Sequence, residues 1–556
     1  MKRVLIVGGA GVFGRRLATG LRATTDAYII LAGRSLARAR EAADTVGAAD
    51  AVVLDRETAM ASDIAKLSAD LVVDAAGPFQ GADLRFARAT IEAGAHYLDL
   101  ADARDFVAAF PQLDTLARER GVAAITGASS TPALTHAVLD HICAGWTRID
   151  TIRAGIAPAN KMDRGPAVMK AILTWTGAPT PVFEDGGWRQ RSGWSDCGII
   201  EVPGLGKRRF AIAETPDLDL LPTRYAARDT ALFMAGLEVP LMQRGMEVLG
   251  ALRRWGVIAD PVRLAEVLRL AGNMLLPFGS DRGGMIVEAT GRDGQDRPTY
   301  ARWSMTAENG LGPYTPTFAA LALARRFATG GDLPAGARPC VAMLTLEDFA
   351  PEFERHAFKT RIDETLLRLP FEMALGADFE TAPPIVRDSH RAGPVTRLAG
   401  EAEVKGASSL LASLFARLFG MPPASAATPV RVTMRLDADK EVWTRRFGER
   451  RMKSRLRFVC PGVVSESFGP FTFDMKLAVT SGSLSMAIIG WRMGPIPLPR
   501  WLAPRSVATE SQDAQGRFRF DVPIALPLIG RLTHYSGWLE LEEVEPAPRA
   551  SLREDA

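Results

Sequence analysis

The sequence predicts an α/β protein with three parts: a doubly wound parallel sheet, an inserted α/β second domain, and a β-rich carboxyl-terminal domain that is an antiparallel sheet or barrel-like. Three observations predict this order. Short β-branched runs alternate with helical patterns over residues 1–130, and a glycine-rich loop directly follows the first run. Strand-like runs separated by turn residues dominate residues 430–541. A chain of 556 residues is also too long for one hydrophobic core.

The composition is ordinary for a globular protein and excludes several classes. Hydrophobic residues make up 47% and charged residues 24%, which argues against a disordered or fibrous chain. A net charge of +3 gives no reason to expect nucleic acid as a partner. No CxxC pair is present, so we expect no metal site and a cytoplasmic protein; the cysteines are Cys143, Cys197, Cys340 and Cys460. Neither a signal peptide nor a transmembrane run of about 20 apolar residues is found.

The amino-terminal elements follow from the alternation. The expected strands are Arg3–Val7, Ala27–Leu31, Ala51–Leu54, Leu71–Val73, Tyr97–Leu100 and Val122–Ile125. The expected helices between them include Arg15–Ala23, Leu36–Val46, Leu84–Ala93 and Leu113–Arg120. Buried strands that alternate with helices indicate a parallel sheet with helices on both faces.

A GxGxxG motif lies between the first strand and the first helix. Gly9 permits the tight turn, Gly11 lets the backbone approach a pyrophosphate, and Gly14 allows close packing of helix and strand, with Val12 and Phe13 between them. The helix amino terminus then offers free N–H donors to phosphates. The motif therefore predicts a Rossmann dinucleotide-binding domain; a purely structural glycine turn is the less favoured alternative.

The end of the second strand indicates which dinucleotide binds. An acidic residue about 20 positions after the motif would hold the ribose hydroxyl of NAD. This chain has Gly33, Arg34 and Ser35 there, and Arg34 and Ser35 suit a 2′-phosphate. The sequence therefore favours NADP(H), with a solvated loop arginine as the alternative reading of Arg34.

Other strand ends are expected to line the same crevice, because ligands of open α/β sheets bind outside the carboxyl ends of the strands. Asp55 would flank the adenine. Small residues and turn formers after the later strands would border the ribose and nicotinamide: Ala76, Gly77, Pro78, Phe79 and Gly127.

The best candidates for catalysis are His96, Tyr97 and Asp99. Imidazole or carboxylate near the cofactor could handle the proton that accompanies hydride transfer. A structural hydrogen-bond cluster at the strand end is the favoured alternative. No tyrosine has a lysine four positions later, which disfavours the short-chain dehydrogenases.

With these residues in view, the chain resembles the saccharopine dehydrogenase-like family of NADP-binding oxidoreductases over about residues 1–348. The resemblance rests on VGGAGVFG at Val7–Gly14, AGRS at Ala32–Ser35, DAAGPF at Asp74–Phe79 and GAHYLDLAD at Gly94–Asp102. A weaker match is the GPYTP-helix region at Gly312–Phe327. The resemblance implies an NADP-binding domain over 1–145, completed by 314–348, and a substrate and dimer domain over 146–313.

The second domain opens with the expected strand Thr151–Ile156 and later forms a hairpin from Met285–Ala289 and Thr299–Ser304. Polar and basic residues after its first strand could bind a substrate carboxylate or phosphate, although loop solvation is the favoured reading: Asn160, Lys161 and Arg164. The Leu237–Val257 segment favours an interdomain or dimer helix over a helix on a membrane surface.

Residues 349–400 are expected to form a linker region, because Thr381–Gly400 is rich in Pro and Gly. A β-rich domain is expected over 401–556. Glu441-Val442-Trp443, Gly469-Pro470 and Pro497-Leu498-Pro499 are among the pieces through which the chain, from about Leu366, resembles a bacterial domain of unknown function that is fused to such oxidoreductases. We expect one helix, Ser408–Phe419, followed by the strands Val430–Leu436, Val442–Phe447, Met452–Val459, Phe471–Val479, Leu484–Trp491, Phe518–Ile524 and Leu532–Leu541.

Bases alternate with other side chains along one expected strand of this domain. Arg451, Lys453, Arg455 and Arg457 then share one face, which is a solvated outer face or, less favoured, a face for anionic lipid or an acidic partner. The domain as a barrel could hold an apolar or lipid ligand.

The sequence thus favours an NADP(H)-dependent oxidoreductase that acts on the C=O, C=N or C=C group of a small-molecule substrate. The alternative is a non-catalytic NADP(H)-binding redox sensor or scaffold whose carboxyl-terminal domain binds a lipid or protein partner.

Overall fold

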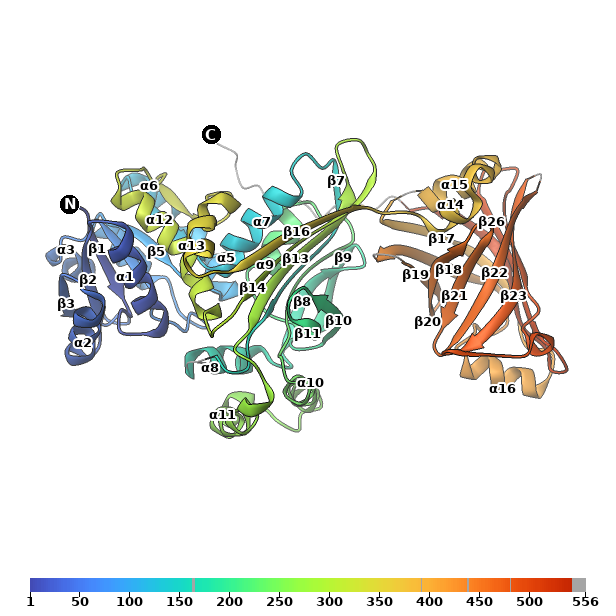
Figure 1. The fold of residues 1–556 in the computed structure, drawn as a ribbon, viewed down its shortest axis with the longest axis horizontal. Helices are drawn as coiled ribbons and strands as arrows, with labels where there is room; N and C mark the ends of the chain where they lie inside the picture. Colours follow the sequence, from blue (N-terminus) through green and yellow to red (C-terminus); the bar gives the residue numbers. More distant parts are fainter. Residues whose placement is uncertain (163–165, 392, 438–439, 481, 543–556) are drawn as a thin grey trace.

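A computed structural model describes residues 1–162, 166–391, 393–437, 440–480 and 482–542. Three units follow one another along the long axis of the molecule: a parallel sheet with helices, a second mixed sheet, and a closed barrel (Figure 1). The predicted fold class is confirmed, and the β-rich end is a barrel rather than an open sheet.

The first unit is a seven-stranded parallel sheet with the order β15-β6-β5-β4-β1-β2-β3. Its strands are β1 (Arg3–Val7), β2 (Tyr28–Gly33), β3 (Asp50–Val53), β4 (Leu71–Asp74), β5 (His96–Asp99), β6 (Ala123–Thr126) and β15 (Gly336–Pro339). Its helices are α1 (Val12–Thr24), α2 (Leu36–Val46), α3 (Ala61–Lys66), α4 (Arg85–Glu92), α5 (Arg104–Ala109), α6 (Asp114–Glu119) and α7 (Thr135–Ile142). The strand order reverses beside β1, where such sheets place their ligands.

A later part of the chain returns to complete this unit. Helix α12 (Phe318–Ala328) packs on α1 where Gly20 leaves room, since a Cβ at Gly20 would lie 2.6 Å from a methyl carbon of Leu321. Strand β15 then pairs in parallel with β6, Gly336 opposite Ala123. The helix and strand close one side of the first sheet.

The second unit is a nine-stranded mixed sheet with helices on one side. Its strands are β7 (Arg148–Ala157), β8 (Pro179–Glu184), β9 (Gly187–Ser192), β10 (Asp196–Val202), β11 (Gly206–Ile212), β12 (Thr230–Ala235), β13 (Gly283–Arg292), β14 (Pro298–Ala307) and β16 (Lys359–Leu366). Its helices are α8 (Pro166–Trp175), α9 (Asp217–Arg224), α10 (Pro240–Arg254) and α11 (Ala265–Met274). The predicted hairpin is present, with Met285 opposite Met305.

Residues 349–400 do not form the predicted linker. They fold into α13 (Ala350–Arg355), β16, α14 (Pro370–Leu375) and α15 (Pro384–Arg391), and they end inside β17 (Val395–Lys405). Phe371 and Phe379 are fully buried in the barrel core. Pro384 starts α15, a position where a helix needs no N–H donor, so the prolines mark a helix start rather than a loose chain.

The third unit is a ten-stranded antiparallel barrel that closes through the pairing of β22 with β23. Besides β17 its strands are β18 (Ser425–Asp437), β19 (Lys440–Phe447), β20 (Arg450–Cys460), β21 (Val463–Phe468), β22 (Phe471–Thr480), β23 (Ser483–Met493), β25 (Val507–Gln512), β26 (Phe518–Leu526) and β27 (Gly530–Leu541). The short β24 (Ile496–Pro497) extends β23. Helices α14 and α15 lie at one end of the barrel, and α16 (Leu410–Leu418) lies across the other (Figure 1).

Strand β20 has the predicted two-residue periodicity. Its basic residues Arg451, Lys453 and Arg455 are exposed, while Met452 and Leu456 point into the barrel and are buried. The alternation therefore separates a wet outer face from an apolar interior, as expected for a barrel wall.

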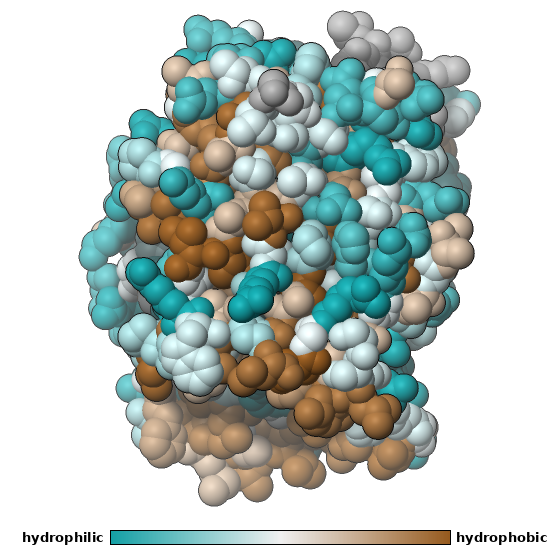
Figure 2. All heavy atoms as spheres, turned by 90° about the vertical axis from the view of Figure 1, so that its right-hand side faces the viewer, coloured by the Kyte–Doolittle hydropathy of each residue, from teal (hydrophilic) through white to brown (hydrophobic). Residues whose placement is uncertain are grey.

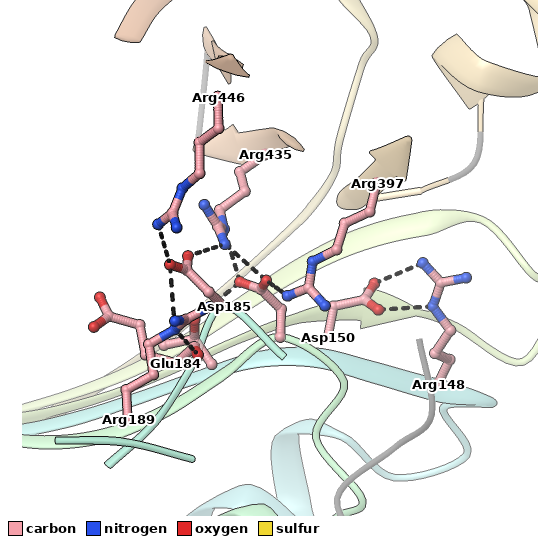
Figure 3. Close-up of polar contacts among 10 residues, drawn as sticks. Arg148, Asp150, Glu184, Asp185, Arg189, Arg397, Arg435 and Arg446 are labelled. Carbon is pink, nitrogen blue, oxygen red and sulfur yellow. Dashed lines mark hydrogen bonds and ion pairs between the residues drawn. The ribbon is translucent and has the colours of Figure 1, made fainter. Parts of the chain in front are cut away.

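Charged side chains join the barrel to the second unit (Figure 3). Arg435 on β18 donates from Nε to Asp229 at 2.7 Å and from Nη2 to Asp185 at 2.6 Å. Arg397 on β17 also bonds to Asp229, and Arg446 lies within 3.3 Å of Asp185. Because Asp229 is 1% exposed, this contact fixes the two units against each other.

Among the described residues, no helix has the length and hydropathy needed to cross a membrane.

Candidate functional site

The glycine loop lies at the carboxyl end of β1, beside the point where the strand order reverses. The N–H groups of Gly8 and Gly9 donate to Ala32 O at 2.9 and 3.1 Å, and Gly11 N–H donates to Gly8 O at 2.8 Å. Gly8 has φ +76°, and a Cβ at Gly14 would overlap the carbonyl oxygen of Gly8. The turn therefore needs glycine at both positions for steric reasons.

Helix α1 begins in this loop with an open amino terminus. Gly11 is its N-cap, and in the described structure neither a side-chain cap nor an acidic residue occupies the first turn. An uncapped helix end presents free N–H donors and the positive end of the helix dipole. These features fit the pyrophosphate of a dinucleotide, and they gather Gly9, Gly11, Val12, Phe13 and Gly14 in one place.

The residues predicted to favour NADP(H) over NAD(H) follow β2. Arg34 is exposed, and no atom lies within 4 Å of a Cβ built at Gly33, so the space beside them is open. Ser35 is the N-cap of α2 and accepts from Arg38 N–H at 3.5 Å. Because α2 has no acid in its described first turn, this corner suits an anion such as a 2′-phosphate.

Asp55 lies in the turn after β3, where its carboxylate accepts from Glu57 N–H at 3.1 Å. Its neighbour Arg56 reaches Asp74 at 3.3 Å and lies over the Phe79 ring, 4.9 Å from the ring centroid. Arg56 was not among the predicted site residues, although an arginine three residues after a strand end could have indicated it.

Residues Ala76–Phe79 border the glycine loop. A Cβ at Gly8 would lie 2.9 Å from the backbone of Ala76, so the two loops are in contact. No atom lies within 4 Å of a Cβ built at Gly77, which leaves that side open. Pro78 follows it in the same turn, and Phe79 turns inward, 4% exposed.

Asp99 ends β5 and holds the loop after β6. Its Oδ1 accepts from Gly127 N–H at 2.7 Å, Thr126 Oγ1 at 2.9 Å and Ala101 N–H at 3.0 Å. Its Oδ2 is buried and has no hydrogen-bond partner among the described residues. Burial, partly opposed by these donors, raises the pKa of Asp99 to about 7. Asp99 and Gly127 therefore lie together, but Asp99 is closed off from water.

Tyr97 points into the hydrophobic core on one face of the sheet. It is 1% exposed and stacks on Phe110 with ring centroids 5.7 Å apart. Burial and the charges of Asp99 and Asp74 raise the pKa of the Tyr97 hydroxyl well above its usual value. A proton leaves this hydroxyl only with difficulty.

His96 lies at the other edge of the sheet from the glycine loop, because it is the first residue of β5 and its strands are parallel. Its Nδ1 accepts from Ala123 N–H at 3.0 Å, and its ring lies 4.7 Å from that of Phe327. Burial and nearby Lys2 lower the pKa of His96. The structure therefore separates His96 from the crevice in which sequence reasoning placed it.

Asp102 is a crevice residue that the sequence reasoning did not select. It is exposed three residues after β5, and its Oδ1 accepts from Gln80 Nε2 at 3.0 Å. Desolvation by the surrounding protein raises the pKa of the Asp102 carboxyl, although water still reaches it. A carboxylate three residues after a strand of a doubly wound sheet was the signal that could have found it.

Arg104 connects the crevice to the second unit. Its guanidinium pairs with both carboxylate oxygens of Asp219 on α9 and donates to Pro181 O at 2.9 Å. Its side chain is only 8% exposed. The Arg104 guanidinium therefore fixes α9 and β8 beside the carboxyl edge of the first sheet.

Of the substrate residues predicted in the second domain, two have local contacts in the described structure and one falls outside the described residues. Asn160 is buried, with its backbone N–H bonded to Glu238 at 2.9 Å and its side-chain amide bonded to Leu275 O at 2.8 Å. Lys161 is exposed, and its N–H donates to Ser280 O at 3.0 Å. Arg164 lies outside the described residues. These contacts assign Asn160 a role in holding α11 in place.

Within the described part of the chain, His, Cys, Asp and Glu side chains form no group of three that could hold a metal ion.

The loop, the open helix end and the parallel sheet together define a dinucleotide-binding domain of the dehydrogenase type. Residues 4–140 match the family model described as the saccharopine dehydrogenase NADP binding domain. Residues 383–539 match a second model, described as a domain of unknown function, DUF4166. Both resemblances noted from the sequence are therefore confirmed over these residues. A search of curated proteins gave no match.

The solved structures that match this chain are remote in sequence. Apo histidine-tagged saccharopine dehydrogenase (L-Glu forming) from Saccharomyces cerevisiae aligns over 66% of this chain and all of its own, with TM-score 0.48 and 11% identity. A probable dehydrogenase from Thermotoga maritima aligns over 62% of this chain and 92% of its own, with TM-score 0.31 and 11% identity. A Gfo/Idh/MocA family oxidoreductase from Vibrio cholerae aligns over 60% and 91%, with TM-score 0.30 and 10% identity.

Proposed function

We propose that this protein is an NADP(H)-dependent oxidoreductase of the saccharopine dehydrogenase-like type, acting on a C=O, C=N or C=C group of a small molecule. The observation that carries the proposal is the glycine loop with the uncapped amino terminus of α1 at the reversal of strand order. When bound, NADP(H) supplies or accepts a hydride.

The residues of the loop would hold the pyrophosphate, and Arg34 would pair with the 2′-phosphate. Arg34 is exposed beside open space, and the described first turn of α2 contains no acid that would repel the phosphate. Ser35 supports this corner by starting α2, since its hydroxyl already accepts from Arg38 N–H. Asp55, in the next turn, would border the adenine.

We assign Asp102 the transfer of the proton that accompanies hydride transfer. It is reached by water, lies at the carboxyl edge of the sheet, and is oriented by Gln80. Its raised pKa makes the carboxyl a better proton donor near neutral pH than an ordinary aspartic acid. Asp99 is a positioning residue in this proposal, since it holds the Gly127 loop from a buried site.

The second unit would cover the crevice and supply contacts to the substrate. The Arg104–Asp219 pair holds α9 beside α5 at the carboxyl edge. Burial raises the pKa of Glu214, just before α9, and Arg104 opposes that rise. The cover is therefore polar on this side, which suits a substrate with hydrogen-bonding groups.

Turnover tests the proposal directly. Loss of NADPH absorbance would be followed with panels of ketones, imines and enones, using the full-length protein. For a substrate found in this way, Asp102→Asn should lower kcat about 100-fold or more while NADPH binding is retained. The matched control is Asp83→Asn, an exposed aspartate paired with Arg85 in the preceding loop, which should keep full activity.

Two results would count against the proposal. Full activity of Asp102→Asn would remove this residue from proton transfer. Stoichiometric NADPH binding without oxidation by any panel would favour the redox sensor, in which the same loop binds the dinucleotide without chemistry.

A further inference from the structure

The barrel encloses an apolar cavity of about 270 Å³. Its wall is formed by inward side chains from many strands, among them Phe447, Met452, Leu456, Met475 and Met486. Small-molecule sites in proteins are typically lined by apolar and aromatic side chains with few polar groups. The interior of the barrel therefore has the character of a ligand site rather than of a filled core.

The charged side chains in the cavity wall have partners of their own. Arg445 donates to Ser454 at 2.8 Å and to Glu466 at 3.0 Å, and its guanidinium lies 4.5 Å from the Trp443 ring centroid. Glu510 lies 2.8 Å from Nε2 of buried His390. Because these charges are already paired, the wall favours a neutral apolar chain over a charged group.

Helix α16 forms the floor of the cavity. Phe415, Phe419 and Met421 line it from below, and Phe419 contacts Phe471 at the start of β22 with ring centroids 5.6 Å apart. The helix begins with Ser409, which caps it and donates to Ile529 O at 2.9 Å. The Ser409–Ile529 hydrogen bond at its start and the Phe419–Phe471 contact at its end thus hold α16 across one mouth of the barrel.

The outer face of α16 is apolar as well. Leu410, Leu414 and Leu418 are 92%, 64% and 76% exposed. Other large apolar side chains at this end of the barrel are exposed too: Met493, Ile496, Trp501 and Leu528. An apolar patch of this kind on a protein surface marks an interaction site.

The second unit presents a similar surface on the same side of the molecule. Helices α10, α11 and α16 all lie along the lower edge in Figure 1, and brown side chains gather along that edge in Figure 2, which is turned about the vertical axis. Exposed apolar residues of α10, α11 and the turns beside them are Leu241, Val248, Trp255, Val257, Val267, Leu270, Met274 and Phe278. We call the exposed apolar residues of these helices and of the α16 end of the barrel the lower face.

We propose that the lower face docks on a lipid bilayer and that the barrel takes up a lipid with a long apolar chain from it through the α16 end. A bilayer is flat and extended, and it can therefore meet apolar helices from two different units at once. Arginines lie beside the exposed Leu, Trp and Phe side chains, here Arg417 and Arg500. This composition is typical of interfacial helices, whose basic side chains also attract anionic lipids.

Continuity with the cavity favours a bilayer over a protein partner. The same helix that exposes Leu414 to the outside lines the cavity with Phe415 and Phe419. A small displacement of α16 would join the apolar cavity to the apolar interior of the membrane, so a chain could pass without crossing water. This role is separate from the proposed oxidoreductase chemistry, which depends on the first unit.

Docking is tested by flotation of the full-length protein with vesicles of phosphatidylcholine and phosphatidylglycerol in equal amounts. The wild type should float with the vesicles. Leu414→Glu with Leu418→Glu should reduce flotation more than about tenfold, because two apolar side chains no longer enter the bilayer. The matched control is Val53→Glu on the edge strand β3, also exposed but remote from the lower face, which should float like the wild type.

Uptake is tested with cis-parinaric acid, whose fluorescence rises when its chain leaves water. The wild type should bind it, and so should the double variant of α16, because that variant changes only the outer face. Val522→Trp, which fills the cavity from β26, should weaken binding of the probe but leave flotation unchanged. Far-UV circular dichroism of every variant serves as the measure of folding, because NADPH binding by the first unit would not report on the barrel.

Three results would overturn the proposal: a wild type that stays in the aqueous fraction, a double variant that floats like the wild type, or a probe that gains no fluorescence. If the lower face instead joins two copies of the chain, sedimentation would show a dimer that the double variant converts to a monomer, without flotation. That outcome would also overturn it.

Discussion

Arg435 of the barrel donates from Nε to Oδ2 of Asp229 in the second unit at 2.7 Å. Arg397 bonds to the same carboxylate from the neighbouring strand. Burial alone would raise the pKa of Asp229, but the hydrogen bonds and charges of the two arginines lower it. One buried carboxylate thus joins two units that are otherwise built from separate sheets.

Asp229→Asn should therefore weaken the attachment of the barrel. The neutral amide keeps the shape but removes the carboxylate that Arg397 and Arg435 share. Arg435 keeps its pair with Asp185, whereas the largely buried Arg397 loses this partner, a loss of about 3–5 kcal/mol for a broken buried pair. The midpoint of denaturant unfolding, followed by tryptophan fluorescence, should fall. The control is Asp296→Asn at an exposed pair with Arg292, which should change the free energy of unfolding by less than about 1 kcal/mol and therefore move the midpoint little. Equal midpoints for the two variants would contradict this role of Asp229.

Gly14→Ala should abolish NADPH binding without unfolding the rest of the chain. A methyl group at this position would overlap Gly8 O, so the loop and the start of α1 must move apart. Isothermal titration with NADPH measures the effect. Gly245→Ala in α10 is the matched control, because a Cβ there has open space and alanine favours a helix. NADPH affinity unchanged in Gly14→Ala would remove this loop from the site.

Asp99→Asn should flatten the dependence of stability on pH. The folded protein raises the pKa of Asp99 to about 7, against roughly 3.9 in an unfolded chain. Over this window the folded state binds the proton more tightly, so the free energy of unfolding falls as pH rises from about 4 to about 7. The Asp99→Asn variant should not show this decrease in the free energy of unfolding. Denaturant midpoints at about pH 5 and about pH 8 measure the difference.

Asp74 provides an internal comparison for that experiment. Burial raises its pKa to about 6, with Arg56 opposing the rise. Asp74→Asn should remove the dependence of the free energy of unfolding on pH only in the lower part of this pH range, up to about pH 6. Identical midpoints of wild type and Asp99→Asn at both pH values would contradict the raised pKa of Asp99.

Six of the seven strands of the first sheet could be predicted because their signals are local, whereas β15 (Gly336–Pro339) is not an apolar run and was not predicted. Each of the six contains a short apolar run, and helix α2 is capped by Ser35 and ends at Val46, before Gly47, which has φ +69°. The glycine motif then fixed the place of the phosphate loop. Periodicity and caps within about ten residues were sufficient.

The closure of the barrel could not be predicted, because it depends on contacts between distant segments. Strand β17 pairs with β27, which places Ala402 opposite Gly537, and its first half lies in the stretch rich in Pro and Gly. Strands β21 and β25 are short and contain several polar residues. Their pairing partners, rather than their own propensities, make them strands.

The catalytic candidates show where residue type misleads. His96 precedes the expected strand Tyr97–Leu100, and in a parallel sheet that position lies at the amino edge, away from the cofactor. Asp102 follows the strand and lies at the carboxyl edge. The direction of the chain was therefore a better guide than the chemistry of imidazole.

The central claim is that the first unit binds NADP(H) through the glycine loop and Arg34. Titration of the full-length protein with NADPH and NADH, followed by nicotinamide fluorescence, tests it directly. The wild type should prefer NADPH, and Arg34→Asp should reverse the preference, while Arg22→Asp at the far end of α1 should leave it unchanged, since it alters the net charge equally. Equal affinity of the wild type for both nucleotides, or the same preference in Arg34→Asp, would contradict the account.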